Sequence, residues 1–174
     1  MIMAAVFKSR STDERETPDD FFQKLNGVFH FTIDLAASHK IHKCPVYFTK
    51  ETDALSRTLF GRGFLNPPFS NLTPWVRWCQ HEGLGPYKPL IVALLPRRRD
   101  AKWYREFCGP PALTVLIPRL KFAGFDTVPK FDLMLVVWNA TRAQIDHLYE
   151  VLNLEPSEWT MVWRRRKVRR RDAA

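Results

Sequence analysis

The segment GRGFLNPPFSN, residues 61–71, carries the residue types best suited to chemistry. Pro67 and Pro68 each fix φ near about −65° and lack an N–H donor, so strand pairing must stop there. The carbonyl oxygens of Asn66 and Pro67 are then available to accept hydrogen bonds, and the ring of Phe69 follows directly. A stiff peptide with two acceptors beside an aromatic ring suits a planar group that carries an NH2.

Helix signals and apolar runs around this segment predict an α/β protein. Thr17 and Asp100 are expected to cap helices, Pro18 to occupy a first helical position, and Thr141 to form a capping box with Gln144. Alternating helices and strands favour a three-layer α/β sheet. The predicted order is helix, strand, strand, strand, helix, strand, helix, strand, strand, helix, at 17–27, 31–38, 46–48, 63–65, 73–81, 89–95, 100–107, 113–117, 131–138 and 141–152.

The composition favours a globular protein with a polyanionic partner. With 27 Lys and Arg against 18 Asp and Glu, the net charge is +9, which favours nucleic acid through counterion release. No apolar run is long enough to cross a bilayer, so we expect a cytoplasmic protein without a membrane partner. The odd number of cysteines predicts reduced core thiols and no disulfides, at Cys44, Cys79 and Cys108.

Three parts of the chain differ in composition. Residues 1–15 lack a periodic apolar pattern and predict a flexible leader, residues 16–155 a single domain, and residues 156–174 a basic tail. The tail contains RRRKVRRR at 164–171, a charge run that predicts disorder in the absence of a partner. We expect the protein to act as a monomer.

One cluster, SHKIHKC, contains metal-ligand residue types. His39, His42 and Cys44 could bind zinc, but structural zinc sites need four ligands, and no matching pair occurs at the usual spacing. We therefore expect surface histidines, a packed thiol and no metal.

Seven segments occur in a set order between residues 16 and 139: TPDDFF, FTIDLAAS, ETDAL, FLNPPFSN, ALLPRRRDAKWY, PRLKF and FDLMLVVWN. In this order they resemble the amino-methyltransferases that use S-adenosylmethionine, and most closely the phage-type DNA adenine N6-methyltransferases of the Dam family. The resemblance implies a Rossmann-like class I methyltransferase fold with α/β/α layers and an antiparallel last strand. It also implies a place in phage or restriction-modification DNA methylation in a bacterial host cell.

The resemblance implies a set of cofactor contacts. The Thr17-Pro18 segment would lie near the methionine end of S-adenosylmethionine, and Asp53 would contact its adenine. The loop after Asp34 lacks the glycines common among methyltransferases and reads DLAAS, whose small residues let a ligand approach the backbone. Alternatively, Asp34 caps a helix and Asp53 forms a turn. The expected cofactor-binding residues are Thr17, Pro18, Asp34, Ala36, Ala37 and Asp53.

The resemblance also assigns the NPPF segment to the target base of double-stranded DNA. The Asn66 side chain and the Pro67 carbonyl would accept the amine hydrogens of an adenine flipped out of the duplex, and Phe69 would stack on its ring. Pro68 completes the rigid element. Phosphate contacts are expected from Arg97, Arg98, Arg99, Lys102, Arg119 and Lys121.

NPP-aromatic segments also occur in enzymes that act on other planar NH2 groups. Cytosine N4, an RNA base or a protein glutamine are therefore alternative substrates. A basic nucleic-acid-binding protein without activity, anchored by the tail, is a further alternative. The basic charge and the seven ordered segments favour adenine in DNA.

Overall fold

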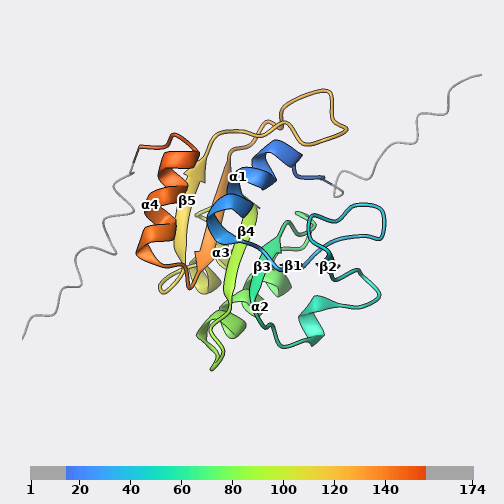
Figure 1. Cartoon of the computed structure of the whole chain (residues 1–174), viewed down its shortest axis with the longest axis vertical. Helices are drawn as coiled ribbons and strands as arrows, with labels where there is room; N and C mark the ends of the chain where they lie inside the picture. Colours follow the sequence, from blue (N-terminus) through green and yellow to red (C-terminus); the bar gives the residue numbers. More distant parts are fainter. Residues whose placement is uncertain (1–14, 156–174) are drawn as a thin grey trace, which may run out of the picture.

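A six-stranded sheet organises residues 15–155, the part of the chain that this computed structural model describes (Figure 1). Residues 1–14 of the predicted leader 1–15 and the predicted tail 156–174 lie outside the described residues, whereas Arg15 is described. The order of helices and strands along the chain is as predicted, and a 3-10 turn lies between the second and third strands. The elements are α1 (Asp19–Phe29), β1 (Ile33–Asp34), β2 (Val46–Tyr47), η1 (Ala54–Ser56), β3 (Arg62–Leu65), α2 (Thr73–Leu84), β4 (Leu90–Pro96), α3 (Lys102–Phe107), β5 (Leu113–Ile117), β6 (Leu133–Trp138) and α4 (Arg142–Val151).

The strands lie in the order β2-β1-β3-β4-β6-β5. β2, β1, β3 and β4 are parallel, and β6 is inserted antiparallel between β4 and β5. The inserted antiparallel strand confirms the fold expected from the resemblance. Because Asp34 pairs with Phe64 and Leu65 with Ala93, the segments that follow β1, β3 and β4 leave the same edge of the sheet. Ligands of open α/β sheets bind at this carboxyl edge.

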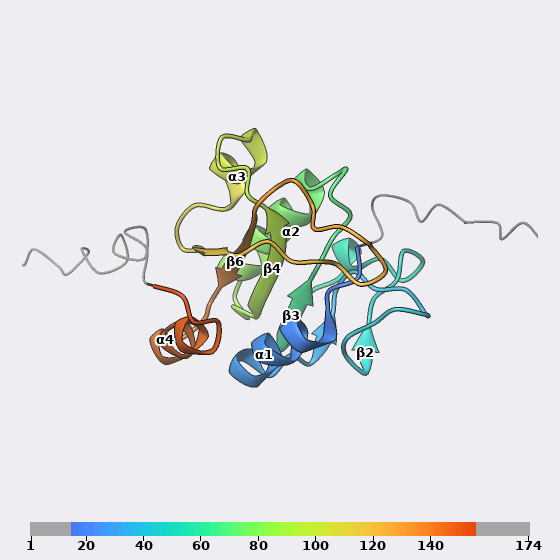
Figure 2. The same cartoon turned by 90° about the horizontal axis from the view of Figure 1, so that it is seen from above.

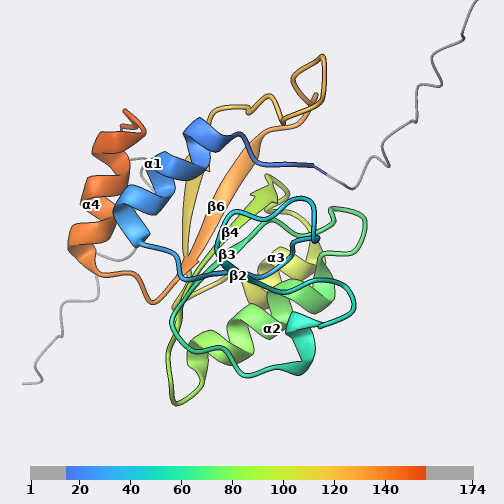
Figure 3. The ribbon, with the colours of Figure 1, turned by 45° about the vertical axis from the view of Figure 1, so that its right-hand side comes forward.

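Two cores fill the space between the sheet and its helices. α1 and α4 pack together on one face, and α2 and α3 lie on the other (Figure 3). β4 separates the two cores: Leu90, Val92 and Leu94 belong to the core beneath α1 and α4, whereas Ile91, Ala93 and Leu95 belong to the other. Every residue of β4 is buried, which confirms the strand predicted to be covered on both faces.

Two predicted helix starts are wrong. Pro18, not Thr17, is the N-cap of α1, and Ala101, not Asp100, is the N-cap of α3; neither helix has a side-chain cap bond. Thr17 is buried and its Oγ1 accepts a hydrogen bond from a distant asparagine amide, so it is not available to the helix. The capping box of α4 is confirmed, with Thr141 as its N-cap.

The first strand is shorter than predicted. β1 consists of Ile33 and Asp34, whereas the sequence predicted a strand over 31–38. The Asp34 carboxylate accepts hydrogen bonds from the backbone N–H groups of Ala36 and Lys43, at 3.3 and 2.9 Å, which turns the chain out of the strand.

α1 is longer than predicted, because it continues past Gly27 to Phe29, and His30 ends it at φ 52°.

The three cysteines are buried free thiols, as the sequence predicted. Burial raises the pKa of the Cys44 and Cys108 thiols to about 12. Among the described helices, none combines the length and the apolar character that crossing a bilayer would require.

Candidate active site

Asn66 is the first residue beyond β3 and lies at the carboxyl edge of the sheet. Its amide Nδ2 donates to the backbone carbonyl of Arg15 and, at 3.1 Å, to Oγ1 of Thr17. A carbonyl can only accept, so this contact fixes which way the amide faces. The other end of the amide, Oδ1, is buried and has no hydrogen-bond partner among the described residues. The side chain therefore presents a positioned acceptor that still needs a donor.

The three residues after Asn66 are held by the fold to different degrees. Pro67 is buried, Pro68 is exposed and Phe69 is half-buried. The Phe69 ring makes edge contacts with the rings of Phe122 and Phe131, whose centroids lie 6.1 and 5.9 Å away. The NPPF element is thus a fixed strand end with an aromatic ring directed at residues from the β5–β6 connection.

Four rings surround the guanidinium of Arg15, and we call them the phenylalanine cage: Phe69, Phe122, Phe125 and Phe131. The distances from the Arg15 Cζ to their centroids are 5.8, 5.7, 5.3 and 5.3 Å respectively. Such distances are those of cation–π contacts. Three of the four rings come from the connection between β5 and β6, which lies beside the segment preceding α1 (Figure 2). An antiparallel bridge between Glu16 and Ala123 joins these two segments.

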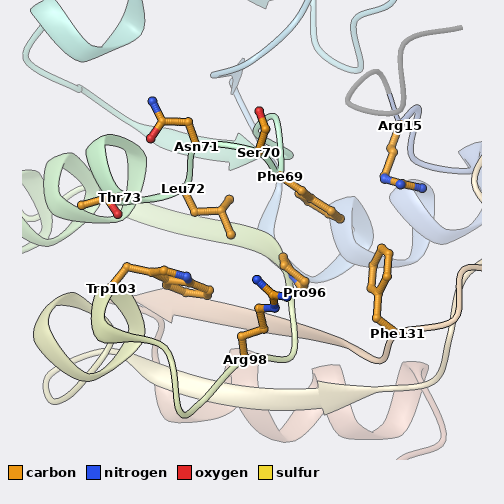
Figure 4. Close-up of a pocket in the computed structure, with 10 residues that line it drawn as sticks. All are labelled: Arg15, Phe69, Ser70, Asn71, Leu72, Thr73, Pro96, Arg98, Trp103 and Phe131. Carbon is orange, nitrogen blue, oxygen red and sulfur yellow. The ribbon is translucent and has the colours of Figure 1, made fainter.

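A cavity of about 430 Å³ opens next to the cage (Figure 4). One wall is formed by the residues from Phe69 to Thr73, and the opposite wall includes Pro96, Arg98 and Trp103. Arg15 and Phe131 line it on the side of the cage. The cavity therefore lies between the ends of β3 and β4 and has both aromatic and cationic groups on its walls.

The predicted cofactor loop is mostly stabilised by its own hydrogen bonds. Asp34 is buried, and desolvation raises the pKa of its carboxyl despite the N–H groups of Lys43 and Ala36. Ala37 donates its N–H to the Phe48 carbonyl at 2.9 Å. The alternative that Asp34 caps a helix is wrong, because the next element along the chain is the strand β2.

Ion pairs of the half-buried Lys43 tie this loop to the start of α1. Lys43 Nζ contacts carboxylate oxygens of Glu16 and Asp19 at 3.1 and 2.5 Å. Burial by itself would lower the pKa of Lys43, but hydrogen bonds from its ammonium to Asp19 and Glu16 outweigh burial and raise it. The loop after β1 and the Thr17-Pro18 segment are therefore held together, as the assignment of both to one cofactor requires.

Asp53 caps the 3-10 turn η1. Its Oδ1 accepts from the Leu55 N–H at 3.1 Å, and its φ is 43°. The turn-forming role considered from the sequence is therefore present. Asp53 is exposed, and a contact with the cofactor adenine stays a prediction.

The basic residues predicted to contact phosphates fall into two groups. Arg97 and Arg119 share the carboxylate of Asp132, at 3.5 and 2.8 Å, and the hydrogen bond from Arg119 lowers the pKa of Asp132. Arg98 instead lines the cavity. The others are Arg99, which is half-buried, Lys102, which lies 3.7 Å from Glu106, and Lys121, which is exposed. Their contacts with DNA stay predictions.

The histidines near Cys44 interact with an aromatic side chain. The His42 ring stacks on Tyr47 with centroids 4.2 Å apart, and the His39 Nδ1 lies 3.3 Å from the Tyr47 hydroxyl oxygen. No group of three or more metal-ligand residues occurs within residues 15–155.

Sequence reasoning missed Arg15, which it placed in the leader, and the cavity-lining roles of Trp103 and Phe131. Arg15 lies outside any apolar pattern, and its four ring partners are distant in sequence. The phenylalanines of FAGF and KF at 122–131 were the available signal, since three aromatic residues in an otherwise irregular connection suggest a buried contact.

Comparison with known protein families gives one result that covers most of the chain. The sequence profile of the family described as DNA N-6-adenine-methyltransferase (Dam) matches residues 5–155. Among curated proteins, none is similar enough to this chain to count as a match. The family match spans all the described elements, including Asn66, the cage and the loop after β1. The chain therefore belongs to the DNA N-6-adenine-methyltransferase (Dam) family.

Proposed function

We propose that the protein transfers a methyl group from S-adenosylmethionine to N6 of an adenine that has been flipped out of double-stranded DNA. The observation that carries the proposal is the buried Oδ1 of Asn66 at the carboxyl edge of the sheet, an acceptor to which no group of residues 15–155 donates. An exocyclic amine supplies the missing donor. The family match favours adenine over cytosine, RNA or glutamine as its source.

The residues at this edge fit the cofactor that the family implies. Asp34 and Asn66 end neighbouring parallel strands, and Ala36 and Ala37 have side chains small enough for a ligand to approach the backbone. Bound S-adenosylmethionine would supply the electrophilic methyl group. The residues proposed to hold it are Thr17, Pro18, Asp34, Ala36, Ala37 and Asp53.

Asn66 and Pro67 would act by positioning and by electrostatics. The adenine amine is a poor nucleophile because its lone pair is delocalised into the ring. If Asn66 Oδ1 and the Pro67 carbonyl accept its two hydrogens, the nitrogen is held closer to tetrahedral and the lone pair is directed out of the ring plane. Positive charge grows on this nitrogen during transfer, so the two carbonyl dipoles stabilise the transition state more than the ground state.

The phenylalanine cage gives the flipped base an apolar place to stack. Unstacking a base costs about a few kcal/mol, and contacts between bases and aromatic side chains contribute about 1–3 kcal/mol each. Phe69 and Phe131 belong to the cage and also line the cavity, so a base in the cavity could stack on Phe69, which follows Asn66 by three residues. Among the proposed phosphate contacts, Arg98 lines the cavity and Lys121 is exposed and precedes the cage residue Phe122.

Product analysis tests this proposal. Purified protein is incubated with methyl-labelled S-adenosylmethionine and with duplex DNA, RNA or a protein extract, and the modified DNA is digested to nucleosides. We expect label in DNA, all of it in N6-methyladenine. Label in N4-methylcytosine, in RNA or in glutamine would show that adenine in DNA is not the substrate. DNA binding without methyl transfer would favour the non-catalytic alternative.

A further inference from the structure

The side chain of Arg15 lies among the aromatic rings, including Phe69, on which the proposed function would stack the base. All four rings of the phenylalanine cage lie within 5.8 Å of its Cζ, and Phe69, the predicted stacking residue, is one of them. In Figure 4 the guanidinium extends toward Phe131, beside Phe69. A guanidinium is itself a flat group that carries NH2, so it resembles the amine edge of adenine in shape and in polarity.

The Arg15 side chain is held by its cation–π contacts with the cage. Its Nε is buried and has no hydrogen-bond partner among residues 15–155, and an unsatisfied buried donor is unfavourable. The guanidinium does not supply the donor that Asn66 Oδ1 lacks within the described part of the chain. It therefore occupies the aromatic part of the site without satisfying the catalytic acceptor, so a ligand that does both would be preferred.

Backbone and side chain of Arg15 have separate roles. Its carbonyl accepts from the Asn66 amide and orients it, and this contact does not depend on the identity of residue 15. The bridge from Glu16 to Ala123, with the Ala123 N–H donating to the Glu16 carbonyl at 3.0 Å, holds the β5–β6 connection against the same segment. Truncation of the side chain would therefore empty the cage and leave the frame around it.

We infer that the Arg15 guanidinium closes the phenylalanine cage in the DNA-free protein and that the target adenine must displace it. The inference rests on the proposed function, because it identifies the cage as the place of the flipped base. A site that is open for only a fraction of the time binds its ligand more weakly by that fraction. Arg15 is thus a positioning residue through its carbonyl and a competitor of the base through its side chain.

Adenosine binding to the Arg15→Ala variant tests this inference without turnover. We expect the variant to bind adenosine about tenfold more tightly than the unsubstituted protein in an NMR titration, since the cage is then always open. Methylguanidinium, which replaces the missing group, should compete with adenosine in the variant and restore the weak binding. Arg142→Ala, which removes one charge from α4 far from the cage, is the matched control and should leave adenosine affinity unchanged.

Several outcomes would overturn the inference. These are an Arg15→Ala variant that binds adenosine no more tightly, binding that is not detectable, or binding that methylguanidinium does not affect. Arg15→Ser provides the same test if the alanine variant folds poorly. Methyl transfer to DNA is measured in parallel. Tighter adenosine binding without any transfer would support the role of Arg15 in the cage and reject the proposed function. Transfer without tighter adenosine binding would support the proposed function and reject the role of Arg15.

Discussion

Asn66 and Asn139 lie at opposite edges of the sheet and use their amides in the same way. Asn66 follows β3, and Asn139 follows β6, which runs antiparallel to the neighbouring β4. Asn139 Nδ2 donates to the carbonyls of Gly83 and Pro89, both at 3.0 Å, and so ties the end of α2 to the start of β4. Asn66 Nδ2 also has two acceptors, but its buried Oδ1 has no donor among the residues that the structure describes.

The two asparagines differ in what their amides are proposed to do: Asn139 stabilises the fold, and Asn66 binds a substrate. At the Asn139 edge, the amide connects elements that must pack for the sheet to close. At the Asn66 edge, two hydrogen bonds hold the amide through Nδ2, but Oδ1 accepts no hydrogen bond from the described residues. An unsatisfied buried oxygen is unfavourable for folding, which is the reason we propose that a ligand supplies its donor.

The largest expected effect follows the substitution Asn66→Ala. Removing one positioned group that stabilises developing charge typically lowers turnover by about 100- to 1,000-fold, and we expect a loss of transfer in this range. The melting temperature should stay close to that of the unsubstituted protein, because the unsatisfied oxygen is lost together with the amide bonds. Methyl transfer to DNA and a thermal melt followed by circular dichroism measure both quantities. Near-normal transfer would contradict the role of Asn66.

Asn139→Ala should show the opposite pattern. The substitution removes two hydrogen bonds and places alanine at φ 60°, which together should lower the free energy of unfolding by about 2 kcal/mol. Transfer per folded molecule should not change. Urea denaturation measures the loss, and Asn139→Gly, which relieves the backbone strain alone, should recover part of it. A transfer defect in a fully folded Asn139→Ala protein would show that the two edges are not independent.

The smallest expected effect is that of Thr17→Val. Valine keeps the shape of the buried side chain but removes the Oγ1 that accepts from Asn66, while the Arg15 carbonyl still holds the amide. We expect transfer to fall by about fivefold, the equivalent of one neutral hydrogen bond of about 1 kcal/mol. Affinity for S-adenosylmethionine, measured by calorimetry, distinguishes the two roles of Thr17. A large loss of that affinity with normal turnover at saturation would make Thr17 a cofactor contact and not a positioning residue.

Much of the fold could be predicted because its signals are local. The unalternated apolar run of β4, the Thr141 capping box and the Pro67-Pro68 stop each depend on a few neighbouring residues, and each is present as predicted. The helix cap predicted at Thr17 is wrong because its side chain is used elsewhere, as the acceptor of a hydrogen bond from Asn66. α3 begins one residue later than a cap at Asp100 would place it. The contacts of Asp34 show the same limit, since one of its partners, Lys43, lies across a loop.

The sequence by itself determined where β3 ends and that an asparagine, two prolines and an aromatic ring follow, because proline restricts φ within its own residue. It also determined the family, through ordered motifs along most of the chain. Only the tertiary structure decided which end of the Asn66 amide remains available, because that depends on acceptors near residue 15. The same holds for the phenylalanine cage around Arg15, since burial and partner choice are properties of segments that meet only when the chain folds.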